Sequence, residues 1–170
     1  MLACVDVAYA PDDTFAVAAG LLFRRWDDAA AATELTARVD EVAPYEPGAF
    51  YRRELPPLLD LLRKVDPLPE VVVVDGYVWL SADGRPGLGA RLFDALGGRV
   101  VVVGVAKTTF HGDAPSIAVK RGKSEKPLHV TAAGATPDEA AAWIQSMHGP
   151  HRLPTLLARV DRLCRDALTR

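Results

Sequence analysis

The 170-residue chain has little of several things that mark particular classes of protein. Its cysteines, Cys4 and Cys164, lie far apart and form no C-x-x-C pair, so we expect a reduced protein of the cytoplasm. No apolar run approaches the roughly 20 residues that a membrane-spanning helix needs. The N-terminus has no basic region, so we expect no signal peptide and no membrane partner.

Common nucleotide-binding and hydrolase motifs are missing as well. The sequence has no P-loop, no G-x-G-x-x-G and no G-x-S-x-G, which argues against nucleotide-binding and serine-hydrolase functions. The four histidines show no zinc-ligand spacing with the cysteines, so a structural zinc site is not expected. The net charge of −2 does not by itself indicate a nucleic-acid-binding protein.

What remains is the composition of an ordinary globular domain, 49% apolar and 25% charged. The chain is long enough to bury a hydrophobic core, and we expect residues 1–170 to form a single domain. Basic residues gather at 120–126 and again after Met147. Such clusters either bind phosphates locally or form a solvated face, and charge alone does not decide between the two.

The N-terminal part predicts consecutive β-strands over 2–9, 15–24 and 33–42, the last of which also has features of a helix. Short connections between these strands favour an antiparallel meander. The segment Pro44-Tyr45-Glu46-Pro47-Gly48 follows and predicts a rigid loop, because it holds two prolines and a glycine.

The rest of the chain alternates strands and helices. We expect a helix that begins near Pro56-Pro57 and ends before Pro67. The later elements are expected as strands at 70–75 and 100–103, a hairpin at 116–132, and helices at 88–96, from 136 and at 154–168. This order predicts an α/β fold with a mixed β-sheet flanked by helices.

The most informative residues are acids set in apolar strand sequences. Asp6 lies between Val5 and Val7, and Asp75 ends a run of four valines. A buried carboxylate is costly unless it is neutralised, paired or bound to a cation, and carboxylates on neighbouring strands would suit a divalent metal. The alternatives are an exposed edge-strand position for Asp6 and an inert Asp-Gly turn for Asp75.

Other candidate residues have equally plain alternatives. Asp161 interrupts an apolar helical face, but it could simply pair with Arg165 four residues on. Glu54 could act as a dipole partner near a helix start, and Lys107 could be a solvated loop residue. Tyr45 could stack on a base, or it could cover an edge of the core.

Several short sequence blocks point to a family. No single block is specific, but their order and spacing together are. They are Cys4-Val5-Asp6-Val7, Pro44-Tyr45-Glu46-Pro47-Gly48 followed by Phe50 to Pro56, Val74-Asp75-Gly76, Gly104-Val105-Ala106-Lys107, and Arg152-Leu153-Pro154 followed by Ala158 to Asp161. Together they resemble the endonuclease V family over nearly the whole chain. The resemblance implies a ribonuclease H-like fold, in which an antiparallel meander joins parallel strands.

The resemblance also implies a catalytic role for matched residues. Asp6, Glu54, Asp75 and Asp161 would be the metal site, which binds Mg²⁺ and for which Mn²⁺ can substitute. Lys107 would contact the scissile phosphate. By the same resemblance, the four acids and Lys107 together are the expected catalytic residues.

Further matched residues would bind the substrate. Tyr45, framed by Pro47, would be a wedge that separates the strands at a lesion. Gly48, Gly76 and Gly104 would line a pocket for a flipped base, where small residues let the backbone come close.

The activity that this resemblance implies is a Mg²⁺-dependent endonuclease of DNA repair, acting as a monomer. It would nick DNA near deaminated bases such as deoxyinosine and leave 3′-hydroxyl and 5′-phosphate ends. The chain departs from the family after Asp75-Gly76, where Tyr77 and Trp79 would narrow the base pocket and the family's histidine is absent. Two alternatives therefore stand: a protein that binds inosine or structured nucleic acid and cuts weakly or not at all, and an endonuclease directed to inosine in RNA.

Overall fold

The computed structural model describes residues 1–47, 49–110 and 114–169. Within them, one seven-stranded sheet has the strand order β3-β2-β1-β4-β5-β7-β6. The strands are β1 (Leu2–Tyr9), β2 (Ala16–Phe23), β3 (Thr33–Val39), β4 (Val71–Asp75), β5 (Val101–Ala106), β6 (Ile117–Val119) and β7 (Leu128–Ala133). The β1, β4 and β5 strands run parallel and the other pairs are antiparallel, so the predicted mixed sheet is confirmed.

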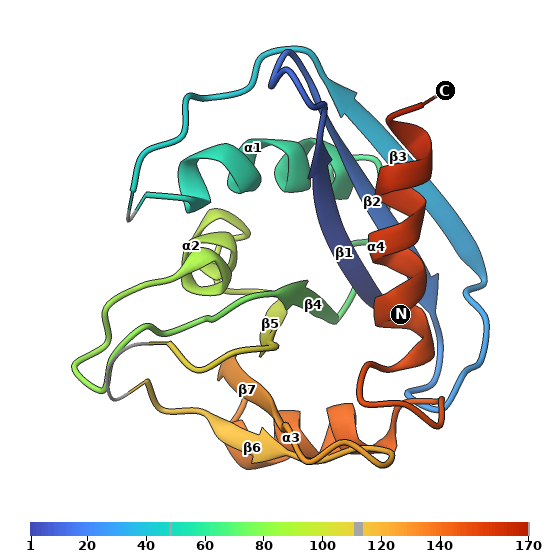
Figure 1. Ribbon diagram of the computed structural model, residues 1–170, viewed down its shortest axis with the longest axis vertical. Helices are drawn as coiled ribbons and strands as arrows, with labels where there is room; N and C mark the ends of the chain where they lie inside the picture. The colour runs from blue at the N-terminus through green and yellow to red at the C-terminus, as the bar shows by residue number, and fades with distance from the viewer. Residues whose placement is uncertain (48, 111–113, 170) are drawn as a thin grey trace.

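Helices cover both faces of this sheet (Figure 1). Their bounds are α1 (Tyr51–Leu62), α2 (Leu88–Ala95), α3 (Pro137–Ser146) and α4 (Thr155–Ala167). The helices α1 and α2 pack on one face, while α3 and α4 pack on the other. In the described part of the chain, no helix is both long and apolar enough to cross a bilayer.

Strand β1 shows how the sequence pattern sets these layers. Successive side chains of a strand point to opposite faces. Ala3 and Val5 accordingly join the core beneath α1 and α2, whereas Cys4 and Ala8 join the core beneath α4. The four valines of β4 are buried because helices cover both faces of the sheet at its centre.

Helix α1 begins earlier than expected, at Tyr51 rather than near Pro56-Pro57. The amides of Arg52 and Arg53 donate to the carbonyls of Ala49 and Phe50, so the first turn closes before the prolines are reached. Proline keeps a helical φ angle, and both prolines continue the helix although neither can donate a hydrogen bond.

The basic segment 120–126 proves to be mixed in character. Lys120 forms an exposed ion pair with Glu125 at 3.0 Å. Arg121 is instead buried, with 5% of its surface exposed, and its guanidinium donates to the carbonyls of His151 and Gly149. Neither a solvated face nor a phosphate patch describes the whole cluster.

Candidate active site

The parallel register of β1 and β4 brings the two strand acids to the same edge of the sheet. Val5 lies opposite Val74 in this ladder, and the next residue of each strand is Asp6 and Asp75. Strand β1 lies inside the sheet between β2 and β4, so Asp6 does not sit on an edge strand. Asp75 ends β4 and projects from the carboxyl edge of the parallel strands, where open α/β sheets place their sites.

Glu54 reaches these acids from the first turn of α1. Burial, together with the negative charges of Asp6 and Asp75, raises the pKa of Glu54 to about 8. Burial also raises the pKa of Asp6 to about 6; the charges of Asp75 and Asp161 add to this rise, and an amide hydrogen bond from Val7 opposes it. The side chains thus form one group of interacting carboxyl groups.

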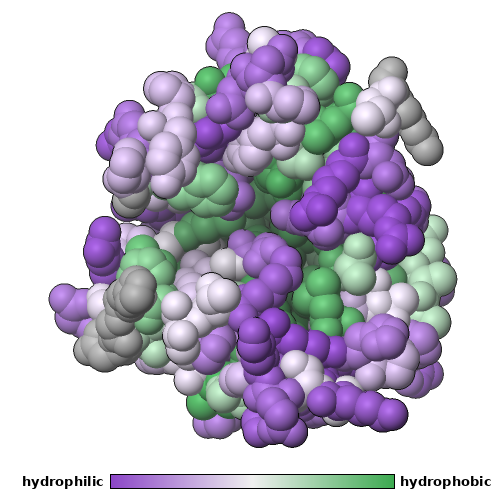
Figure 2. All heavy atoms as spheres, viewed as in Figure 1, coloured by the Kyte–Doolittle hydropathy of each residue, from purple (hydrophilic) through white to green (hydrophobic). Residues whose placement is uncertain are grey.

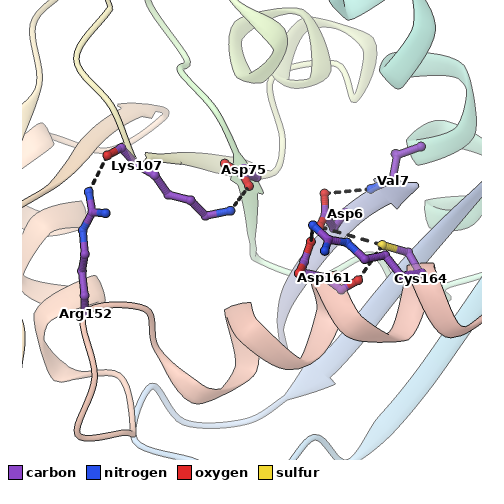
Figure 3. Close-up of polar contacts among 8 residues, drawn as sticks. Asp6, Val7, Asp75, Lys107, Arg152, Asp161 and Cys164 are labelled. Atoms are coloured by element: carbon purple, nitrogen blue, oxygen red, sulfur yellow. Dashed lines mark hydrogen bonds and ion pairs between the residues drawn. The ribbon is translucent and has the colours of Figure 1, made fainter. Parts of the chain in front are cut away.

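Asp161 approaches from α4 on the other face of the sheet. Figure 3 shows it beside Asp6, with the Cys164 thiol between α4 and β1. The carboxylate also pairs with Arg165 at 2.9 Å. Leu157 and Cys164 are buried in the core, as the helical pattern predicts, and Asp161, between them in sequence, lines the cavity with the other acids.

Lys107 follows β5 and completes the group. Its Nζ lies 2.6 Å from Oδ2 of Asp75, and both side chains remain 43% exposed (Figure 3). Burial works against the charge of Lys107, but the hydrogen bond to Asp75 and the surrounding carboxylates raise its pKa above the ordinary value. The ammonium is therefore fully charged at neutral pH.

All the residues expected to be catalytic line one cavity of about 1060 Å³. Figure 2 shows this face hollowed near its centre, with hydrophobic side chains deep inside and hydrophilic ones around them. The residues that converge there from different elements are Asp6, Glu54, Asp75, Lys107 and Asp161. The sheet and helices thus assemble side chains that are far apart in sequence.

The chemistry of this cavity fits a divalent cation. Carboxylate oxygens are the ligands that Mg²⁺ takes in proteins. Burial and the neighbouring acids raise the pKa values of Asp6 and Glu54, and a cation would stabilise the charged carboxylates that burial disfavours. Among the residues that the structure describes, however, no group of three or more His, Cys, Asp or Glu side chains is close enough to hold an ion. Coordination would therefore require side-chain movement.

The glycines expected to bind substrate occupy different depths. Gly76 lines the cavity with φ at +125°, a conformation that glycine favours. Gly104 lies behind it and is not among the lining residues. A Cβ at Gly104 would come within 2.5 Å of the Gly76 carbonyl oxygen and 2.7 Å of Thr131 Oγ1. Gly104 therefore lets β5 support the Gly76 segment from beneath.

The loop expected to act as a wedge is exposed. Tyr45 is 62% exposed, and its ring meets Phe50 edge-on at 6.5 Å between centroids. Pro47 is exposed as well, and neither residue lines the cavity. The predicted pocket residue Gly48 lies outside the described residues.

The segment after Gly76 is anchored to the neighbouring strands. The Tyr77 hydroxyl donates to the Thr108 carbonyl at 2.9 Å and accepts the Phe110 amide at 3.1 Å. The Trp79 indole donates to the Ala132 carbonyl at 2.9 Å. Tyr77 forms part of the cavity wall, but Trp79 is not among the lining residues and packs against the core instead.

Sequence reasoning missed a cationic wall of the cavity, formed by Arg85 and Arg91. The Arg91 guanidinium stacks over the Tyr51 ring, 3.6 Å from its centroid, and so ties α2 to α1. Within the described chain, neither arginine has a carboxylate partner. No motif in the sequence marks these arginines, since Arg85 lies in the loop before α2 and Arg91 on this short helix, where charged residues are usually solvated.

Comparison with known proteins agrees with this arrangement. The sequence model of the Endonuclease V family matches residues 1–136. Endonuclease V of Streptomyces coelicolor is 32% identical over 96% of this chain and 77% of that protein. The Streptomyces avermitilis relative is 30% identical over 96% of this chain and 79% of its own length.

Solved structures of the same family share the fold. The crystal structure of Endonuclease V from Streptomyces avermitilis superposes with a TM-score of 0.79 at 27% identity, covering 99% of this chain and 81% of that one. Endonuclease V of Ciona intestinalis, in complex with a 24mer DNA containing an inosine followed by a ribo-adenosine, gives a TM-score of 0.83 at 20% identity, covering 99% and 85%. The predicted ribonuclease H-like fold is thus confirmed. Because the family model spans most of the sequence, the chain belongs to the Endonuclease V family of nucleases.

Proposed function

We propose that this protein is a Mg²⁺-dependent endonuclease that nicks DNA near a deaminated base, deoxyinosine, as a step of DNA repair. The products would carry 3′-hydroxyl and 5′-phosphate ends. One observation carries the proposal: the acids and the lysine matched to the family's motifs converge on one cavity from separate elements. Sheet packing alone gives no reason to gather so many interacting carboxylates, since their repulsion destabilises the fold.

The acids Asp6, Glu54 and Asp75, with Asp161 from the other face, would hold the metal. A Mg²⁺ ion held there would supply an activated water and stabilise the leaving oxygen. Glu54, whose pKa burial and its acidic neighbours raise to about 8, would release its proton on binding a cation, and Asp6 would do so at pH values below its raised pKa of about 6. The ammonium of Lys107 would move from Asp75 to a phosphate oxygen and offset the charge that develops there.

Arg85 and Arg91, which have no carboxylate partner among the described residues, support a nucleic-acid substrate despite the net charge of −2. Arg85 and Arg91 line the same cavity as the carboxylates and present guanidinium groups that suit phosphate oxygens. A strand lying across the cavity would place one phosphate at the acids and Lys107 and a neighbouring one at the arginines. The exposed Tyr45 supports its proposed role as a wedge, because a side chain that enters a duplex must be accessible.

The proposal is tested by cleavage of matched duplexes with and without a single deoxyinosine. We expect a nick in the inosine strand with Mg²⁺ or Mn²⁺ and none with EDTA. Asp75→Asn should abolish cleavage without lowering the melting temperature, whereas Asp94→Asn, a matched change at an exposed site on α2, should not affect cleavage. Equal cutting of undamaged DNA would refute the lesion specificity, and full activity of Asp75→Asn would remove that residue from the site.

A protein that binds inosine without cutting is the second candidate. It is favoured by the absence, in the described residues, of a preformed metal-ligand group, and by the ion pair that occupies Asp75. A gel shift on inosine DNA with no product in Mg²⁺ or Mn²⁺ would support it, and multiple turnovers would exclude it. The same assay with inosine placed in RNA separates the two nuclease alternatives.

A further inference from the structure

Arg152, just before α4, reaches across to the end of β5. Its Nη2 donates to the backbone carbonyl of Lys107 (Figure 3). The same nitrogen donates to the carbonyl of Pro127 at 2.7 Å. The same Lys107 extends its side chain toward Asp75. Arg152 thus contacts the main chain from which the lysine projects, without lining the cavity itself.

The end of the β5–β7 ladder explains why a donor is needed there. The last pair of the ladder joins Ala106 to His129. Beyond this pair the ladder no longer supplies donors, so the backbone carbonyls there need a donor from elsewhere. One nitrogen of Arg152 supplies it to Lys107 and Pro127 together. The sheet hydrogen bonds hold the backbone of β5 up to Ala106, and the Arg152 guanidinium holds the next residue, Lys107.

Arg152 is in turn held by the buried Arg121. The Arg121 guanidinium donates to the carbonyls of Met147, Gly149 and His151, which fixes the loop between α3 and α4. Within the described residues Arg121 has no carboxylate partner, so these backbone carbonyls offset its charge. The result is a chain of contacts from a buried arginine through a loop to the site.

We propose that Arg152 is a positioning residue for Lys107. This inference rests on the proposed function, in which Lys107 contacts the phosphate. A lysine has a flexible side chain, and here it is 43% exposed, so the place of its amine depends on how firmly its backbone is held. A displacement of about 1 Å at a reacting group can cost roughly 100-fold in rate.

A double-mutant cycle on cleavage of the inosine duplex tests the proposal. We expect Arg152→Gln to lower kcat by about 10- to 100-fold with KM changed by less than about threefold. In a Lys107→Ala background the same substitution should have no further effect on kcat, because the arginine acts only through the lysine. Arg152→Lys, which keeps one donor, should recover part of the loss.

Arg159→Gln is the matched control, since Arg159 lies on α4 and pairs with Glu34 outside the cavity. It should leave kcat unchanged. If Arg152→Gln lowered kcat by the same factor in the wild type and in Lys107→Ala, Arg152 would have a structural role, and the proposal would be overturned. Unchanged kcat in Arg152→Gln would overturn it as well. Should Arg152→Gln fail to fold, Arg152→Lys carries the same cycle.

A second measurement is independent of cleavage. In protein whose lysines carry ¹³C-methyl groups, the Lys107 resonance is identified by its loss in Lys107→Ala. We expect Arg152→Gln to shift or broaden this resonance, and Arg159→Gln to leave it in place. An unmoved resonance would refute the positioning role even in a protein that does not cut. Lack of cleavage by the wild type would refute the proposed function alone.

Discussion

Glu54 offers the most direct test of the electrostatic argument for this cavity. Burial beside Asp6 and Asp75 raises its pKa from 4.5 to about 8. Around neutral pH the folded protein therefore keeps a proton on Glu54 that the unfolded chain has lost. For an acid whose pKa is raised on folding, stability falls as the pH rises from the unfolded to the folded value. Glu54→Gln, which is neutral at every pH, should escape this loss.

The size of the effect follows from the pKa values. Between pH 4.5 and pH 7, at about 1.36 kcal/mol per pH unit, Glu54 lowers the free energy of unfolding of the wild type by at most about 3.4 kcal/mol. Glu54 is only partly buried, and solvent screening reduces this to about 1.5 kcal/mol. For a chain of this size that corresponds to roughly 3–6 °C in melting temperature.

The assay is thermal unfolding in EDTA at pH 5, 7 and 8.5. Glu54→Gln should melt near the wild type at pH 5 and progressively above it as the pH rises. Glu41→Gln, at an exposed glutamate in the loop after β3, is the control and should show no such trend. A variant that melts below the wild type at pH 8.5, or a gap that narrows with pH, would refute the argument that burial beside these acids disfavours the charged form of Glu54.

Further predictions concern the cation, the cationic wall and the glycine support. Mg²⁺ should raise the melting temperature more at pH 8 than at pH 5, where protons compete for the acids, and Asp6→Asn should reduce the rise; a rise independent of pH would contradict this. Arg91→Gln should lower the slope of log Kd against log salt by about one in fluorescence anisotropy, unlike Arg99→Gln, and an unchanged slope would exclude a phosphate contact. Gly104→Ala should cost about 1–3 kcal/mol in urea unfolding, because its Cβ would meet the Gly76 carbonyl, and wild-type stability would contradict that close approach.

The strand acids could be found from sequence because strand burial leaves few alternatives. Asp6 and Asp75 stand out against apolar neighbours, and an interior parallel register then places them side by side. The cap at Thr136 could be found in the same way, since its hydroxyl and Glu139 form a reciprocal pair that depends only on residues three apart. Such features are local or follow from a fixed period.

The positions of Glu54 and of the cationic wall depend on how the helices pack against the sheet, and no local sequence pattern predicts that packing. The sequence pattern predicts the start of α1 too late, because proline at a first turn is only a preference, whereas the observed start depends on amides that donate to Ala49 and Phe50. Without the family resemblance, Glu54 would have remained a residue near a helix end. Arg91 faces the cavity only because α2 packs beside α1, and its contact with Tyr51 joins these helices.

The departure from the family after Asp75 need not close the base pocket. The bulky residues of this segment make contacts within the fold. Trp79 packs into the core and donates to the Ala132 carbonyl. The Tyr77 hydroxyl donates to the Thr108 carbonyl and accepts the Phe110 amide. Tyr77 thereby braces the segment just after Lys107, on the cavity side, while Arg152 holds the carbonyl of Lys107 itself. Residues that would only obstruct a base would have no reason to make these contacts. The cavity of about 1060 Å³ remains beside them, which favours a nuclease with an altered wall over a protein that has lost its site.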